Sequence, residues 1–163
     1  ANVHRAPENC GGTSRGISKI EVWLGDGKWD VIHFNFGIHD RGTAITDYTK
    51  RLGRLIGRLQ KTGAKLIWAS TTPIPDDAAQ NQTAASVIER NRAAAELMKK
   101  HNIPVDDLFT AVTPHLGEYQ QPNNVHFKEE GYDFLGRQVG AAIDAVLQGK
   151  PLPAPEPATN TQP

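Results

Sequence analysis

Apolar side chains recur every three or four residues in four stretches of the chain, which is the spacing of one helix face. The predicted helices cover residues 13–24, 45–61, 83–101 and 127–147. The most regular apolar face belongs to the second: Tyr48, Leu52, Leu55, Ile56 and Leu59. Thr13 or Ser14 is the expected N-cap of the first helix and Thr83 that of the third. Gly63 and Gly149 are expected to end the second and the fourth.

Two of these helices have less regular apolar faces. The inward positions expected in the first are Ile17, Ile20, Val22 and Leu24. Those expected in the last are Tyr132, Leu135, Val139, Ile143 and Val146. Both sets predict that the helix packs with one side on a core.

Short apolar segments separate the helices. Residues 29–36 (WDVIHFNF) and 64–70 (AKLIWAS) are rich in β-branched and aromatic side chains and are apolar on both faces. That pattern is typical of buried parallel strands. Residues 103–107 predict a shorter strand, followed by a helical turn at 108–112 and a loop at 113–125, and residues 3–6 are interpreted as the end of a further strand.

Strands and helices therefore alternate along the chain, which predicts a parallel sheet with helices on both faces, a three-layer α/β/α fold. Residues 1–149 suit one domain. Residues 150–163 are proline-rich, with little to bury, and predict a disordered tail or linker. Ligands in such folds bind beyond the carboxyl ends of the strands. The loops expected there are residues 7–12, 37–43, 71–82 and 113–126.

Composition excludes several classes of function. Eighteen basic residues balance eighteen acidic ones, so no overall field favours nucleic acid. No apolar run approaches the roughly 20 residues that a membrane helix needs. Cys10 is the only cysteine, so neither an internal disulfide nor a zinc site built from cysteines is expected.

Three of the strand-end loops contain groups suited to catalysis. Their sequences are Asn9-Cys10-Gly11-Gly12, Gly37-Ile38-His39-Asp40 and Asn123-Asn124-Val125-His126. Glycines before a helix let a ligand oxygen approach backbone N–H groups. A histidine in such a loop can act as a general base. Each motif alone could be an ordinary turn or helix cap. The spacing of the three motifs together favours an active site.

Together these segments resemble the SGNH hydrolases, also described as GDSL-like, which are ester hydrolases with a flavodoxin-like fold. The resemblance implies that Gly12 is an oxyanion-hole donor and that His126 is the general base. His39 stands where the family usually has asparagine, and is implied as the second oxyanion donor. Asn123 stands where the family usually has aspartate, and is implied to orient His126.

The resemblance extends over residues 1–147. It makes Gly37 and Asp40 supporting members of the third family block, and it implies no cofactor and no metal. The stretches WDVIHFNFGIHD and NNVHFKEEGY resemble a branch that includes carbohydrate acetylesterase-like proteins. The expected substrate is therefore a small ester or an acetylated carbohydrate, and the resemblance favours a periplasmic or secreted location.

The family's first block, a strand ending in Gly-Asp-Ser, has no counterpart here. The four serines are Ser14, Ser18, Ser70 and Ser86, and none follows a strand in that way. Ser70 is expected to satisfy local backbone instead. The nucleophile is therefore expected upstream of Ala1, as part of a domain of roughly 180–200 residues. The absent strand belongs in the interior of the sheet, so a gap is expected between residues 3–6 and 30–36.

Two other functions stay open. The chain could be a non-catalytic binding domain without a nucleophile. It could also be a metal-dependent phosphoesterase, which would need His39, Asp40 and His126 to converge. Outside these motifs, His33 is interpreted as a hydrogen-bonded core histidine. Arg90 is expected on a solvated helix face together with Asn91 and Arg92.

Overall fold

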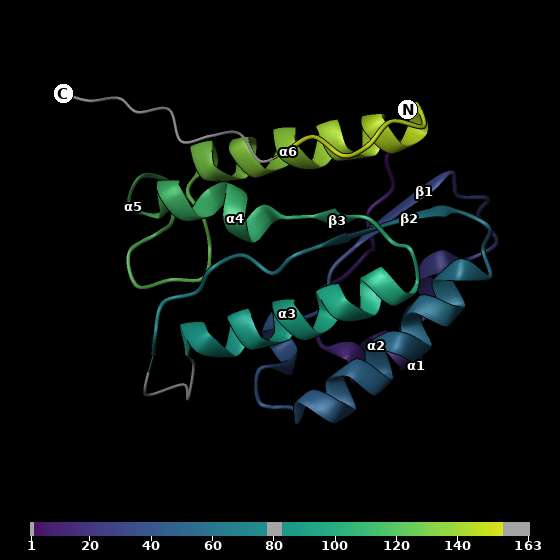
Figure 1. Cartoon of the computed structure of the whole chain (residues 1–163), viewed down its shortest axis with the longest axis horizontal. Helices are drawn as coiled ribbons and strands as arrows, with labels where there is room; N and C mark the ends of the chain where they lie inside the picture. Colours follow the sequence, from purple (N-terminus) through teal and green to yellow (C-terminus); the bar gives the residue numbers. More distant parts are fainter. Residues whose placement is uncertain (1, 78–82, 155–163) are drawn as a thin grey trace.

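Three short strands form the centre of the molecule in the computed structural model, which describes residues 2–77 and 83–154 (Figure 1). They are β1 (Val31–Phe34), β2 (Lys65–Ala69) and β3 (Val105–Asp106). All are parallel, in the order β1-β2-β3, with His33 opposite Ile67 and Ala69 opposite Asp106. The parallel sheet predicted from the alternating pattern is confirmed. Each strand is shorter than its apolar segment.

Helices cover both faces of this sheet (Figure 1). One face carries α1 (Thr13–Leu24), α2 (Ile45–Gln60) and α3 (Ala84–Lys100). The other carries α4 (Leu108–Val112), α5 (Leu116–Tyr119) and α6 (Glu129–Leu147). The segment after α4 was expected to be a loop. It contains a 3-10 turn at Thr113–His115 followed by the short helix α5. None of the helices among the described residues has the length and apolar composition needed to cross a bilayer.

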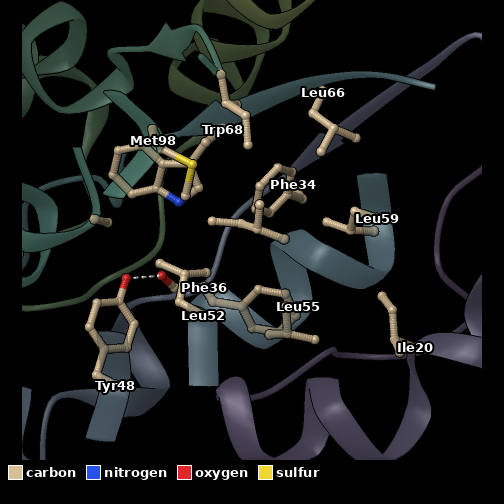
Figure 2. Close-up of a cluster of buried hydrophobic side chains, with 13 residues drawn as sticks. Ile20, Phe34, Phe36, Tyr48, Leu52, Leu55, Leu59, Leu66, Trp68 and Met98 are labelled. Atoms are coloured by element: carbon tan, nitrogen blue, oxygen red, sulfur yellow. Dashed lines mark hydrogen bonds between the residues drawn. The ribbon is translucent and has the colours of Figure 1, made fainter. Parts of the chain in front are cut away.

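The larger core lies between the sheet and α2, as Figure 2 shows. The predicted apolar face of α2 is fully buried: Tyr48, Leu52, Leu55, Ile56 and Leu59. It packs against Phe34, Trp68 and Met98 from β1, β2 and α3. Burying each large aliphatic side chain contributes about 1.5–3 kcal/mol. This face therefore fixes α2, and with it the loop that precedes α2, against the carboxyl end of β1.

A second cluster lies under α6. It comprises Ala69, Leu108, Ala111, Val112, Phe127, Phe134 and Leu135. Phe127 is 3% exposed and lies two residues before the start of α6, so the segment that carries His126 is anchored on the core at the end of β2.

Two side chains predicted to point inward are exposed. Val22 is 71% exposed, because it follows Ile20 by two residues and so lies on the opposite face of α1. Tyr132 is 51% exposed. The buried stripe of α6 is centred on Phe134, Leu135, Gln138 and Ala142. Tyr132 lies at its margin, where its ring meets that of Phe127 edge to face.

A groove of about 660 Å³ runs along the edge of β1 that faces away from β2. Its lining includes residues 2–6, Trp23 of α1, all of β1 and Ile143 of α6. Residues 3–6 were predicted to end a strand, but they form none, since no neighbouring strand pairs with them. The gap expected between this segment and the strand at 30–36 lies where this groove is found.

The domain boundary expected after residue 149 stays a prediction. Helix α6 ends at Leu147, and Gly149 follows with a φ of 68°, a left-handed conformation that suits glycine. The predicted tail, residues 150–163, lies outside the described residues from 155 onward, as do residues 78–82 of the predicted 71–82 loop.

Candidate active site

Four loops meet at the edge of the sheet where the strands end. The first is the segment before α1, the second follows β1, the third follows β2, and the fourth lies between α5 and α6. Hydrogen bonds and close contacts tie each loop to the next, as described below. The predicted site residues lie in these loops.

The buried carboxylate of Asp40 joins the first loop to the second. Its Oδ2 accepts the Thr13 backbone N–H at 2.8 Å and its Oδ1 accepts the Thr13 hydroxyl at 2.7 Å. Asp40 is 2% exposed. The predicted N-cap, Thr13 or Ser14, is wrong, because both residues are inside α1 and the N-cap is Gly12, which has no capping side chain. Asp40 supplies that cap from 27 residues away, and its negative charge suits a helix N-terminus.

The same contact leaves little room for a side chain at Gly12. A Cβ there would lie 3.1 Å from each carboxylate oxygen of Asp40. Among the described residues the Gly12 N–H makes no hydrogen bond, and neither does the side chain of His39, which is exposed in the 3-10 turn Ile38–Asp40. Two potential donors are thus available on adjacent loops.

Arg90 of α3 binds the backbone of the second loop. Its guanidinium donates to the carbonyl oxygens of Asp40 at 2.8 Å and Thr43 at 2.6 Å. It also donates to Ser86 O at 2.9 Å. The expectation of a solvated side chain is wrong: Arg90 is 4% exposed. Its helical position could have revealed this, because it falls on the buried stripe with Val87, Ala94 and Met98.

Gly37 connects the second loop to the third. Its φ is −178°, an extended conformation, so the requirement for glycine is one of space. A Cβ at Gly37 would lie 2.1 Å from the hydroxyl oxygen of Thr71. Thr71 is fixed in turn by Asn91, whose side chain accepts from its N–H at 2.9 Å and donates to its carbonyl at 2.8 Å.

The fourth loop carries His126 and is tied to the third by Gln120, which donates to Pro73 O at 2.8 Å. His126 is exposed. Its Nδ1 lies 2.8 Å from Oδ1 of Asn124. The ring is therefore paired with Asn124, one residue after the position expected. The role predicted for Asn123 stays a prediction.

No serine among the described residues is placed as a nucleophile at this edge. Ser70 donates to Asp107 Oδ1 at 2.9 Å and accepts the Phe109 N–H at 2.8 Å, which confirms its local structural role. Ser14 and Ser18 lie in α1, and Ser86 lies in the first turn of α3.

Cys10 does not replace the serine. Partial burial raises the pKa of its thiol, and the charge of Glu8 raises it further. The thiol therefore lacks the thiolate character of a nucleophilic cysteine at neutral pH.

His33 is a hydrogen-bonded histidine of the sheet, as expected. Its Nε2 lies 2.9 Å from Oδ2 of Asp106, whose other oxygen accepts from Gln138 at 3.2 Å.

The metal-dependent alternative gains no support from this geometry. Within residues 2–77 and 83–154, no three side chains of His, Cys, Asp or Glu are grouped as metal ligands. Both oxygens of Asp40 are engaged by Thr13.

Comparison with known proteins identifies relatives of this arrangement. The sequence profile of the GDSL-like lipase/acylhydrolase family matches residues 8–134. A search of curated proteins found no match.

Solved structures share the fold. A lipase/acylhydrolase from Enterococcus faecalis aligns with a TM-score of 0.70 and 23% identity, covering 90% of this chain and 74% of that one. A GDSL-like lipase from Bacteroides thetaiotaomicron aligns with a TM-score of 0.71 and 15% identity, covering 83% and 72%. An acetylxylan esterase from Geobacillus stearothermophilus gives 0.67 and 15%, covering 78% and 65%. At these identities the likeness concerns the fold.

Proposed function

Because this chain belongs to the GDSL-like lipase/acylhydrolase family, we propose that it hydrolyses esters by a serine–histidine mechanism. His126 is the general base, and the serine comes from a strand that occupies the groove beside β1. One observation carries the proposal most. The contact between Asp40 and Thr13 holds Gly12 against the loop of His39, and Gln120, in the segment that carries His126, donates to Pro73 O in the loop after β2.

The groups at this edge suit each step of ester hydrolysis. His126 takes the proton of the serine hydroxyl while the serine oxygen attacks the ester carbonyl. The Gly12 N–H and a ring N–H of His39 donate to the oxyanion that forms. His126 returns the proton to the leaving alcohol, and water releases the acyl group from the serine by the same steps. Removing one oxyanion donor typically lowers kcat about 10²- to 10³-fold.

The shape of the groove supports a strand as its occupant. Asp30 O accepts the Lys65 N–H of β2, so by the alternation of a strand Val31 and His33 direct their backbone groups toward the groove. Buried unpaired backbone groups cost about 1–3 kcal/mol each. A parallel strand would pair with them between α1 and α6. Its carboxyl end would then lie at the edge that carries Gly12, His39 and His126.

We place this strand before residue 1 in the sequence. Residues 2–6 line the groove and lead through the first loop into α1, so a strand that precedes them can return along β1. A Gly-Asp-Ser sequence at its end would set the hydroxyl at the active edge.

The substrate class is a small ester, such as an acetyl group on a carbohydrate. Two observations favour it. His39 and His126 are both exposed, so a bulky alcohol portion can remain in solvent. Solved structures of the same fold include acetylxylan esterases.

The test uses the natural polypeptide that includes the sequence preceding residue 1. We expect it to hydrolyse p-nitrophenyl acetate, and we expect His126→Ala to lower kcat by roughly 10³-fold or more. His101→Ala, at the far end of α3, is the matched control and should retain activity. A His126→Ala variant with the wild-type rate would exclude the mechanism.

Covalent labelling separates the hydrolase from a non-catalytic binding domain. The folded natural polypeptide should react with a fluorophosphonate probe at one serine. If it remains unlabelled, the hydrolase proposal fails and the binding domain is favoured.

A further inference from the structure

The segment that carries His126 is a narrow turn held by backbone hydrogen bonds. Gln120 and Phe127 form an antiparallel bridge at its base. Gln121 donates its N–H to His126 O at 3.0 Å and its side-chain amide to Phe127 O at 3.1 Å. Asn124, at the tip, donates its N–H to Gln121 O at 3.2 Å. Asn124 and His126 are thus fixed relative to each other by the main chain.

One atom of Asn124 contacts two nitrogen atoms of His126. Its Oδ1 lies 3.0 Å from the backbone nitrogen of His126 and 2.8 Å from the ring Nδ1. A backbone N–H can only donate, so the atom that meets it is the amide oxygen and not the NH₂ group. An amide oxygen can only accept. The ring therefore carries a proton on Nδ1, and in the neutral ring the free lone pair is then on Nε2.

We propose that Asn124 is the positioning residue that holds His126 in the Nδ1–H form and so makes Nε2 the base. This inference rests on the proposed function for its catalytic meaning. It moves the orienting role from Asn123, three residues before the histidine, to Asn124, two residues before it. Asn123 adopts a left-handed φ of 52°, and the turn presents Asn124 to the ring.

The effect on the ring is measurable, because a histidine without such a partner favours the Nε2–H form in water. A single neutral hydrogen bond shifts an equilibrium by roughly 2- to 10-fold. Asn124→Ala should therefore reduce the ratio of the Nδ1–H form to the Nε2–H form of His126 by about that factor. Asn123 and Asn124 are both exposed, so neither substitution removes a core contact.

The experiment is a ¹⁵N–¹H correlation of the histidine rings in the full chain, at a pH where His126 is neutral. The matched variants are Asn124→Ala and Asn123→Ala. We expect the first to shift the His126 tautomer ratio and the second to leave it unchanged. An unchanged ratio in Asn124→Ala, or a shift in Asn123→Ala, would overturn the proposal.

Asn124→Asp provides a rescue. Its carboxylate still accepts from Nδ1, so the Nδ1–H form should persist. The added negative charge should raise the pKa of His126 by favouring the imidazolium. Asn123→Asp should raise that pKa less. The opposite order would return the orienting role to position 123 and overturn the proposal.

This readout requires neither a nucleophile nor a substrate. Suppose that the natural polypeptide is inactive and unlabelled but shows the expected tautomer shift. The hydrolase proposal would then fail, and the pairing of Asn124 with His126 would stand. An active enzyme in which Asn124→Ala leaves the His126 tautomer ratio unchanged would support the hydrolase proposal and overturn the role of Asn124.

Discussion

Two buried polar side chains, Tyr48 and Asp40, hold the loop that carries His39. The Tyr48 hydroxyl donates to Phe36 O at 2.7 Å, and the Asp40 carboxylate accepts from Thr13. Tyr48 could be predicted as buried from helix periodicity, but its hydrogen-bond partner could not. Asp40 could be predicted as a member of the site. Its role as a cap could not, because capping patterns in a sequence are local.

Tyr48 predicts a stability change at alkaline pH. Burial raises the pKa of its phenol, and the charge of Asp40 raises it further. The neutral phenol therefore stabilises the fold fully below the unfolded-state pKa of about 10. That stabilisation is lost as the pH rises above this value, because the unfolded chain releases the proton first. Tyr48→Phe should lower the free energy of unfolding by about 1 kcal/mol at pH 7. Urea unfolding should show that the difference in the free energy of unfolding between wild type and Tyr48→Phe is smaller at pH 11 than at pH 7.

Tyr132→Phe is the control for this experiment, since Tyr132 is exposed. It should leave the free energy of unfolding unchanged at both values of pH. A gap between wild type and Tyr48→Phe that stays constant from pH 7 to pH 11 would contradict the argument.

The sequence also located His126, Gly12 and His39 in loops at one edge of the sheet, because strand order and loop position follow from the alternating pattern. It did not identify Arg90 or Asn124. Arg90 is charged, and charged side chains are seldom buried unless they are paired. The contact of Asn124 depends on the geometry of one turn, which residue types alone do not specify.

At the scale of elements, helices were predicted more accurately than strands. The α1 and α2 boundaries agree with the predicted ranges to within one residue, because a helix satisfies its own hydrogen bonds. A strand needs a neighbour. The apolar segment at 29–36 therefore forms a ladder only over Val31–Phe34, and residues 3–6 form none.

Helix α3 positions the second loop through Arg90, and this can be tested. Arg90→Met keeps an apolar stem but leaves the carbonyl groups of Asp40 and Thr43 without their donor. We expect a loss of about 2–4 kcal/mol in the free energy of unfolding. Amide hydrogen exchange should also accelerate in residues 38–43. Arg92→Met, exposed on the same helix, should change neither quantity by more than a small amount. Equal effects of the two substitutions would refute the role given to Arg90.

For the molecule as a whole, the main feature is a sheet whose edge strand β1 faces a groove between two helical layers. The groove beside β1 has α1 on one side and α6 on the other, so it has the surroundings of an interior strand. A gap at this position was expected from the resemblance to the SGNH hydrolases.

Hydrogen exchange along β1 tests whether a strand fills the groove. Val31 and His33 direct their amides toward the groove, and Ile32 and Phe34 direct theirs toward β2. In the 163-residue chain the first pair should exchange at least about tenfold faster than the second. In a longer polypeptide that supplies the proposed strand, that difference should disappear, because the strand would pair with β1. Persistence of fast exchange at Val31 and His33 there would show that no strand occupies the groove.

The contact between Asp40 and Thr13 also bears on the order in which the molecule assembles. α1 is 12 residues long and has no capping side chain at its N-cap. An isolated helix of that length is marginal in water. The acceptor for the first backbone N–H of α1 is the side chain of Asp40, 27 residues further along the chain. On a ribosome, the start of α1 is therefore capped only after Asp40 has emerged and docked, so the loop before α1 and the loop after β1 reach their final structure together.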